Sequence, residues 1–246
     1  MSLPVHVVPS LEGVTVGAVV EVTGDEAHHA VAVRRLRVGE PLVLTDGAGR
    51  SVTGEVASTG KRVFTVTVAA AFDAARPEPE LVVVQALPKG DRGELAVEML
   101  TEIGAARIVP WAASRSVAVW KGERAVKSLS RWRSTAREAA KQARRSWFPE
   151  VDELASTADV SALLGAASLG VVLHEEASVP LASLDVPATG AVVVVVGPEG
   201  GLTDEEVAAF VAAGATSVRL GAEVLRTSTA GVAAAAALLS RTPRWS

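Results

Sequence analysis

The chain has 246 residues, of which 49% are apolar, so it can form one large or two small domains with a real core and is not a disordered protein. It contains no cysteine, which excludes disulfides and thiolate metal sites. The net charge of -4 argues against a protein that coats nucleic acid through a generally basic surface.

The amino terminus carries no targeting pattern. Met1 to Ser10 lacks a basic stretch followed by a long apolar run, so we expect no signal peptide and a cytoplasmic protein. The valine run from Val192 to Val196 is too short to span a bilayer, and no membrane partner is expected.

Residues 13–72 are rich in valine, threonine and glycine, in short alternating runs separated by turns. The runs at residues 42–44, 51–57 and 62–69 predict three strands of a small antiparallel β-barrel.

The segment from Asp25 to Arg37 departs from this pattern, because it begins like a short helix and ends in three arginines. Its adjacent histidines, His28 and His29, are interpreted either as a solvated or capping pair or as part of a binding surface. Adjacent histidines cannot easily converge on one ion, so no metal site is expected.

The segment from Asp73 to Glu80 contains two prolines in a charged setting and is typical of a linker. We therefore predict two domains, residues 1–73 and residues 74–246. The next predicted elements are a buried strand at residues 81–87, a helix at residues 92–103 stopped by Gly104, and a strand at residues 108–109 ended by Pro110. A strand, helix and strand in this order predict a parallel sheet.

The most basic segment runs from Lys121 to Arg145, where nine Lys or Arg residues against two Glu residues give +7 and leave -11 for the rest of the chain. On a helix, Leu129, Trp132 and several alanines fall on one arc, and most of the cations fall on the other. The ordinary interpretation is a solvated helix face. In an otherwise acidic chain, such concentrated charge favours contact with phosphates.

Two strand, turn and helix units follow each other closely near the carboxyl end. The predicted elements are strands at residues 170–174, 192–196 and 217–220, a helix opened by a Thr203 and Glu206 capping box and closed by Gly214, and a helix at residues 231–239. The stretch from Gly197 to Gly201 breaks the central strand, and its three glycines let a ligand approach main-chain groups. Ligands of open α/β sheets bind outside the carboxyl ends of the strands, so we expect the site there. Neither the P-loop nor the dinucleotide pattern is present.

Motifs along the chain match one family. They are GPEGGLTDEE at residues 197–206, LGAEVLRTSTA at residues 220–230, QALPKGD at residues 85–91 and RLRVG at residues 35–39. In these motifs the chain resembles the RsmE-type SPOUT methyltransferases, which methylate N3 of a uridine in 16S ribosomal RNA. The resemblance implies an α/β protein with an amino-terminal PUA-like β-barrel that binds RNA and a carboxyl-terminal SPOUT domain with a trefoil knot. It also implies S-adenosyl-L-methionine as cofactor, a homodimer, and 16S ribosomal RNA or the small ribosomal subunit as partner.

The resemblance further implies the site residues. The expected cofactor-binding residues are Leu173, His174, Glu175, Gly197, Pro198, Glu199, Gly200, Gly201, Leu220, Gly221, Leu225, Arg226 and Thr227. The expected RNA-binding residues are Arg34, Arg35, Arg37, Lys89, Arg115, Arg131, Lys141, Arg144 and Arg145. Lys141 and Arg144 replace a glutamate and a glycine often found in the family, which makes this chain more basic.

Catalysis is expected to rest on Arg226 and Glu199. Arg226 lies in the LRT turn, where a fixed cation would stabilise the anion that forms when the uridine loses its N3 proton. Many relatives have glutamate where this chain has Ser228, which cannot act as a base at neutral pH, so Glu199 is the remaining candidate for proton acceptor.

Several alternatives stay open. Arg226 either stabilises this anion or only pairs with Glu199 or Glu223. His174 is either structural or catalytic, and the helix at residues 231–239 is either a core helix or part of a dimer interface. The alternative functions are a SPOUT methyltransferase that acts on another RNA site, a non-catalytic RNA-binding relative that has lost cofactor binding, and an enzyme that holds a phosphorylated small ligand at the glycine loop.

Overall fold

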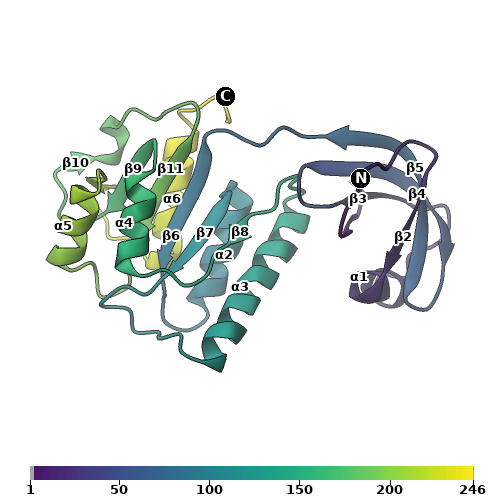
Figure 1. Ribbon diagram of the computed structural model, residues 1–246, viewed down its shortest axis with the longest axis horizontal. Helices are drawn as coiled ribbons and strands as arrows, with labels where there is room; N and C mark the ends of the chain where they lie inside the picture. Colours follow the sequence, from purple (N-terminus) through teal and green to yellow (C-terminus); the bar gives the residue numbers. More distant parts are fainter. Residues whose placement is uncertain (1–2, 246) are drawn as a thin grey trace. The chain divides into compact units, whose positions relative to one another are not determined.

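The computed structural model describes residues 3–245, so the first two residues and the last residue of the two expected domains lie outside the described part. The chain folds into two compact units (Figure 1). The first unit runs to Arg76 and also contains Lys141–Phe148, and the second unit contains Pro77–Ala140 and the chain from Pro149 onward.

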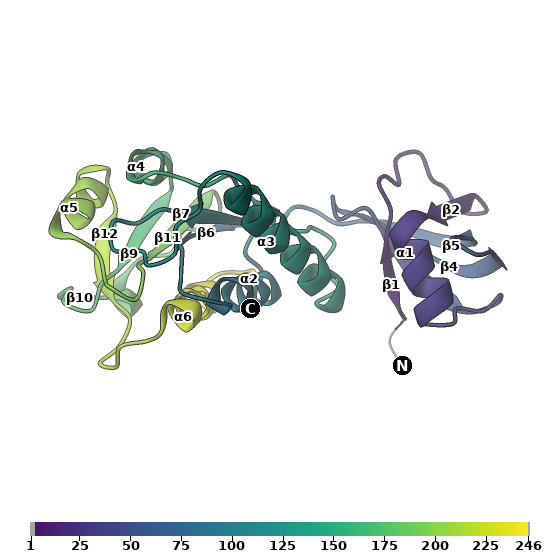
Figure 2. The ribbon, with the colours of Figure 1, turned by 90° about the horizontal axis from the view of Figure 1, so that it is seen from below.

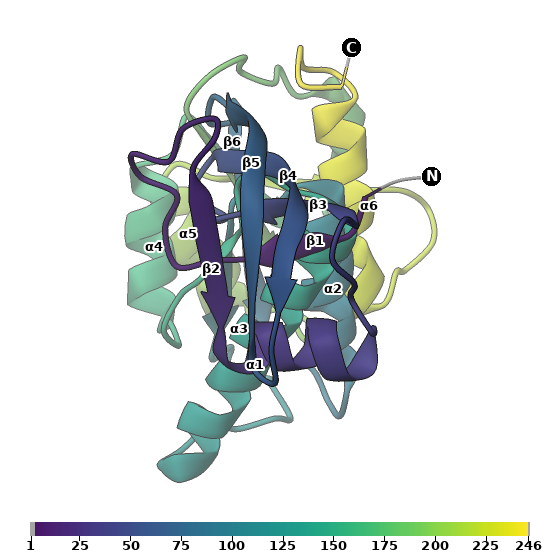
Figure 3. The same ribbon diagram turned by 90° about the vertical axis from the view of Figure 1, so that its right-hand side faces the viewer.

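The first unit is built on a five-stranded sheet in the order β1-β3-β4-β5-β2, and Figure 3 shows β4, β5 and β2 side by side. Its strands are β1 (Val5–Val7), β2 (Val19–Thr23), β3 (Pro41–Thr45), β4 (Arg50–Thr59) and β5 (Val63–Asp73). The predicted antiparallel strands are confirmed as β3, β4 and β5, whereas β1 pairs with β3 in parallel. Within residues 3–245 the two edge strands are not paired with each other, so the barrel is half open.

Alternation along these strands explains the core of the first unit. Val52 and Val56 of β4 and Phe64 and Val66 of β5 are buried, because side chains at every second position of a strand point to the same face. A short helix, α1 (Gly24–His28), and the π-helix η1 (His29–Val33) cover this face, as the sequence predicted for the start of that segment.

Residues 141–148 complete the first unit, although the linear sequence assigned them to the carboxyl-terminal domain. The main chain of this segment pairs with the β3–β4 turn, where Gly49 N donates to Ser146 O at 2.9 Å and Phe148 N donates to Gly47 O at 2.8 Å. Both glycines have positive φ, and a Cβ on either would collide with an aromatic ring of the segment. Glycine is therefore required at both positions by close packing as well as by conformation.

The second unit contains a parallel seven-stranded sheet in the order β10-β12-β9-β11-β6-β7-β8, which confirms the predicted parallel topology. The strands are β6 (Glu80–Ala86), β7 (Arg107–Trp111), β8 (Glu150–Val151), β9 (Leu169–Leu173), β10 (Val179–Pro180), β11 (Ala191–Val196) and β12 (Thr216–Arg219). The helices are α2 (Arg92–Ile103), α3 (Glu123–Gln142), α4 (Thr157–Gly165), α5 (Asp204–Ala212) and α6 (Thr227–Leu239), with the 3-10 turn η2 (Leu181–Ser183).

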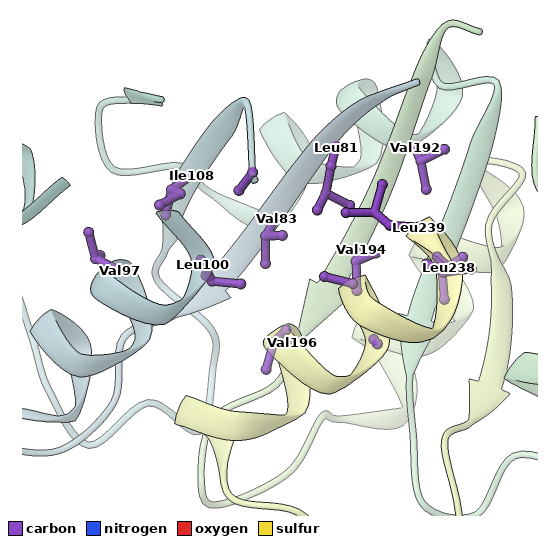
Figure 4. Packing of buried hydrophobic residues seen from close by; sticks show 14 of the residues in the cluster. Leu81, Val83, Val97, Leu100, Ile108, Val192, Val194, Val196, Leu238 and Leu239 are labelled. Carbon is purple, nitrogen blue, oxygen red and sulfur yellow. The ribbon is translucent and has the colours of Figure 1, made fainter. Parts of the chain in front are cut away.

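Helices cover both faces of this sheet, with α2 and α6 on one side and α4 and α5 on the other (Figure 2). The valine run of β11 shows why both faces are apolar. Val192, Val194 and Val196 pack towards α2 and α6 (Figure 4), whereas Val193 and Val195 pack towards α4 and α5. Successive side chains of a strand point to opposite faces, so a strand buried on both faces reads as a continuous apolar run.

Several element boundaries differ from the prediction by one or more residues, and hydrogen bonds account for two of these differences. Pro110 belongs to β7 instead of ending it, and its carbonyl accepts a hydrogen bond from Ala155 N at 2.8 Å. Helix α6 begins at Thr227, before the predicted start at Gly231, because the Arg226 carbonyl accepts bonds from Thr229 N and Ala230 N, both at 2.9 Å. None of the helices in the described residues is long and apolar enough to cross a membrane.

Candidate active site

A pocket of about 320 Å³ lies in the second unit at the carboxyl ends of β9, β11 and β12, where open α/β sheets bind their ligands. All the predicted cofactor-binding residues except Gly200 line it. Residues that line the pocket and were not predicted are Arg92, Val196, Leu202, Arg219, Ala222, Glu223, Val224 and Ala230. Five of these lie within the two glycine-containing motifs and two, Val196 and Arg219, directly precede them, so their place in the motifs is the signal that could have identified them.

The glycine loop after β11 is shaped by Arg115. The guanidinium Nη1 of Arg115 donates to Gly200 O at 3.3 Å and to Leu202 O at 3.1 Å. A Cβ on Gly200 would lie 3.0 Å from Arg115 Cβ and 3.1 Å from Arg115 O, closer than neighbouring atoms normally allow. Close packing against Arg115 therefore accounts for glycine at position 200, whereas Gly197 and Gly201 line the pocket itself.

The capping box predicted at the start of α5 is present. Thr203 Oγ1 accepts from Glu206 N at 3.2 Å, and Glu206 Oε2 accepts from Thr203 N at 2.9 Å. The other oxygen of this buried carboxylate, Oε1, accepts from Ser114 N at 2.8 Å. Glu206 thus fastens the end of the glycine loop to the loop that carries Arg115.

Two charged residues of the pocket form a partly exposed ion pair. Arg92 Nη1 lies 3.4 Å from Glu199 Oε1, and Lys89 N donates to the same oxygen at 3.1 Å. Arg226 is exposed at the pocket, and within residues 3–245 its side chain has no ion-pair partner. The alternative in which Arg226 pairs with Glu199 or Glu223 is therefore not what the structure shows.

A buried polar chain that sequence reasoning missed reaches the pocket from β6. Gln85 Nε2 donates to Thr227 Oγ1 at 2.9 Å, and Thr227 Oγ1 donates to Gly197 O at 2.7 Å. The available signal was a single polar residue at the end of an apolar strand.

The predicted RNA-binding residues fall into different settings. Arg34, Arg35, Arg37 and Arg144 are exposed, and Arg145 is half-buried. Lys89 and Arg115 are exposed beside the glycine loop, and Arg131 pairs with Glu94 of α2 at 3.2 Å. Three further exposed cations of α3, which have no carboxylate partner in the described residues, are Arg124, Lys127 and Arg137.

Lys141 corrects one expectation, because it is not an exposed cation of the RNA-binding face. Its ammonium contacts both carboxylate oxygens of Glu26, at 3.1 and 3.0 Å, and the two side chains are only 11% and 13% exposed. Burial by itself would raise the pKa of Glu26, but hydrogen bonds from His6 and Lys141 outweigh it and lower that pKa to about 2. Lys141 therefore serves the packing of the first unit.

No group of three or more His, Cys, Asp or Glu side chains in residues 3–245 is arranged to hold a metal ion. His28 and His29 are exposed in the short helical segment and do not form such a group.

The fold and the pocket define a class of protein when they are compared with known proteins. Residues 76–239 match the RNA methyltransferase domain family, and residues 22–69 match the RNA methyltransferase PUA domain family. Two curated relatives are ribosomal RNA small subunit methyltransferase E from Mycobacterium bovis, 45% identical with 93% of this chain and 89% of the relative covered, and from Bacillus subtilis, 31% identical with 90% of each covered. The chain belongs to the ribosomal RNA small subunit methyltransferase E family.

A solved structure agrees with this assignment. Ribosomal RNA small subunit methyltransferase E from Neisseria gonorrhoeae, bound to S-adenosyl methionine, is 27% identical and superposes with a TM-score of 0.86 over 97% of this chain and 98% of that one. The predicted family and the predicted two-domain fold class are thereby confirmed.

Proposed function

We propose that the protein transfers a methyl group from S-adenosylmethionine to N3 of a uridine in 16S ribosomal RNA of the small subunit. The observation that carries the proposal is the glycine-walled pocket at the carboxyl ends of β9, β11 and β12, in a chain of the methyltransferase E family. When bound, this cofactor supplies an electrophilic methyl group on a positively charged sulfur.

The residues of the pocket fit such a cofactor. A volume of about 320 Å³ is that of a small-molecule site. Leu173, Val196 and Leu225 offer apolar surface for an adenine ring, and Gly221 leaves the main chain open to a ligand. Carboxylates on the lining, Glu199 among them, suit the positive charges of a sulfonium and an ammonium group.

The proposal assigns acceptance of the N3 proton to Glu199. Its Oε1 is held by Lys89 N and Arg92, whereas its Oε2 has no hydrogen bond to the described residues. Uridine N3 carries a proton at neutral pH, so its attack on the methyl group needs an acceptor within hydrogen-bond reach. Ser228 does not compete for this role, since it is only 4% exposed in the first turn of α6.

The proposal assigns to Arg226 the stabilisation of the negative charge that then develops on the uracil oxygens. It stands immediately before α6 at the pocket, and no carboxylate within residues 3–245 neutralises it. A fixed donor of this kind contributes about 10² to 10³ in rate when water is excluded from the site.

The RNA would be held by cations of both units. The proposal assigns this role to Arg34, Arg35 and Arg37 of the PUA domain, to Lys89 and Arg115 beside the glycine loop, and to the exposed cations of α3. Phosphate contacts hold an RNA without reading its sequence, so selection of the uridine is left to the pocket.

The proposal also includes a homodimer formed through the second unit, a trefoil knot in that unit and a cytoplasmic location. Val224 is 79% exposed and Leu225 is 41% exposed, which gives the surface around the pocket an apolar character suited to a partner subunit. One face of α6 is occupied by the core, since a Cβ on Gly231 would lie 3.2 Å from Val196 Cγ2. A dimer contact through α6 would therefore use its opposite, alanine-rich face, and sedimentation analysis would report it.

The test is methylation of small subunits and of free 16S ribosomal RNA, both from cells that lack this enzyme, with radiolabelled S-adenosylmethionine. We expect label in one uridine and a reverse-transcription stop there, because a methyl group on N3 blocks the pairing edge of the base. Absence of label in both substrates, by a protein that binds S-adenosylhomocysteine, would contradict the proposed substrate.

A further inference from the structure

Gln85 is a fully buried polar residue in a strand whose other buried residues are all apolar. It lies in β6 after four buried aliphatic residues, and its own exposure is 0%. A buried amide that forms no hydrogen bonds costs about 1–3 kcal/mol, so such a residue is retained only where it forms useful ones. Gln85 does not line the pocket, and any effect it has on the site must pass through a neighbour.

The direction of its hydrogen bonds is fixed by chemistry. Gln85 Nε2 contacts Ala86 O at 3.1 Å and Thr227 Oγ1 at 2.9 Å. A carbonyl oxygen can only accept, so the amide nitrogen must be the atom that faces it. Thr227 Oγ1 therefore accepts from Gln85, and its own hydrogen is directed to Gly197 O, 2.7 Å away.

This series of hydrogen bonds ends at a main-chain carbonyl of the pocket, that of Gly197. Gly197 is the first residue after β11, Thr227 is the first residue of α6, and both line the pocket. These hydrogen bonds thus connect three elements, β6, α6 and the glycine loop, at the place where the loop leaves the sheet. The hydroxyl engages one lone pair of the Gly197 carbonyl oxygen and leaves the other for an incoming N–H donor.

In this position one polar atom of Gln85 is left without a hydrogen bond. Its amide oxygen is buried and has no hydrogen-bond partner in the described part of the chain. An apolar residue, like the neighbouring valines, would avoid that cost and still fill the strand. The orphaned oxygen therefore argues that the donor side of the amide is what the site requires.

We propose that Gln85 is a positioning residue, which acts through the Thr227 hydroxyl to hold the Gly197 carbonyl ready for an N–H group of the cofactor. The inference rests on the proposed function, in that it takes the pocket to bind S-adenosylmethionine. It adds a residue outside the pocket and a defined direction for each hydrogen bond in the chain.

The first experiment compares Thr227→Val with Thr227→Ser. Valine keeps the shape of threonine but removes the hydroxyl, whereas serine keeps the hydroxyl. By calorimetry we expect S-adenosylhomocysteine to bind about tenfold more weakly to Thr227→Val and with nearly the parent affinity to Thr227→Ser. In turnover assays, the KM for the cofactor should rise in Thr227→Val, while kcat at saturating cofactor changes little.

Thr45→Val is the matched control. Thr45 lies in the first unit, is 2% exposed, and its hydroxyl also donates to a carbonyl, Arg50 O at 3.2 Å, and accepts from an amide, Gly47 N at 3.1 Å. This variant should lose thermal stability to an extent similar to that of Thr227→Val and keep the parent's cofactor affinity. A merely structural role for Thr227 would make the two variants alike in both measurements.

The second experiment changes Gln85, the first donor in the series of hydrogen bonds. Gln85→Leu removes the donor, and Gln85→Glu replaces it with a carboxylate that accepts instead, so the Thr227 hydrogen would turn away from Gly197. We expect both variants to weaken S-adenosylhomocysteine binding at least as much as Thr227→Val does. If the parent protein binds this ligand and Thr227→Val binds it equally well, the positioning role is wrong and the pocket assignment stands. If the parent does not bind it, the proposed function itself fails.

Discussion

Substitution of Gly221 by valine would locate the cofactor without disturbing the fold. Gly221 lines the pocket in the turn after β12, and its φ lies outside the left-handed region. A Cβ at this position would meet only Glu223 Oε2, at 3.8 Å, which is an ordinary van der Waals contact. The free protein therefore has room for the side chain, and we expect the melting temperature to stay close to that of the parent.

The same side chain would occupy space that the cofactor needs. The pocket measures about 320 Å³, so a ligand that fills it cannot move aside for the three carbon atoms of a valine side chain. Forcing extra methyl groups into a filled site costs about 1–3 kcal/mol. That free energy corresponds to a roughly 5- to 150-fold weaker binding of S-adenosylhomocysteine.

Calorimetry on three variants gives the assay. Gly165→Val is the control, because Gly165 ends α4, does not line the pocket, and a Cβ there would meet only Ala213 O at 3.6 Å. It should bind the ligand as the parent does. Gly200→Val should instead lower the melting temperature, because its Cβ would press on Arg115 at 3.0 Å. Parent-like affinity in Gly221→Val would refute the proposed cofactor position.

Three further predictions concern other groups. Arg226→Ala and Arg226→Lys should lower kcat by about 10² with little change in cofactor affinity, and an equal fall in both quantities would indicate a structural role. Removal of the exposed cations of α3, as Arg124→Ala, Lys127→Ala and Arg137→Ala together, should weaken RNA binding. The slope of log affinity against log salt concentration should become shallower by roughly 0.7 to 0.9 per lost contact. An unchanged slope, measured by fluorescence anisotropy, would show that this helix face is merely solvated. The pKa of Glu26 is lowered from 4.5 to about 2, which corresponds to a contribution of about 3 kcal/mol to the free energy of unfolding. This contribution is fully present above pH 4.5 and is lost as the pH falls through about 2. The free energy of unfolding, measured with urea, should therefore fall more steeply in the parent than in Glu26→Gln as the pH is lowered from 6 to 2. Parallel plots of this free energy against pH would contradict the ion pair's role.

Local patterns in the sequence determined much of the second unit. Helix α2 has the predicted bounds, because a turn precedes it and Gly104, at φ +103, ends it. The Thr203 and Glu206 capping box forms as predicted, since it needs only residues three positions apart. The valine run at β11 indicated a strand covered on both faces, and the glycine motifs indicated the edge of the sheet where the pocket lies.

Only the tertiary structure decided which distant residues meet. The basic pattern identified Lys141 as a cation, but its carboxylate partner, Glu26, is 115 positions away and cannot be seen in a helical periodicity. Residues 141–148 likewise join the first unit through pairing with the β3–β4 turn.

The same holds for the pocket. The sequence treated Gly200 and Gly221 alike, whereas the structure packs one against Arg115 and opens the other to the pocket. It also joins Gln85 to Thr227 across 142 positions. Periodicity and capping depend on neighbours a few residues apart, so a sequence shows them directly. A hydrogen bond between distant residues depends on the path of the whole chain, and that path is set by the packing of complete sheets and helices.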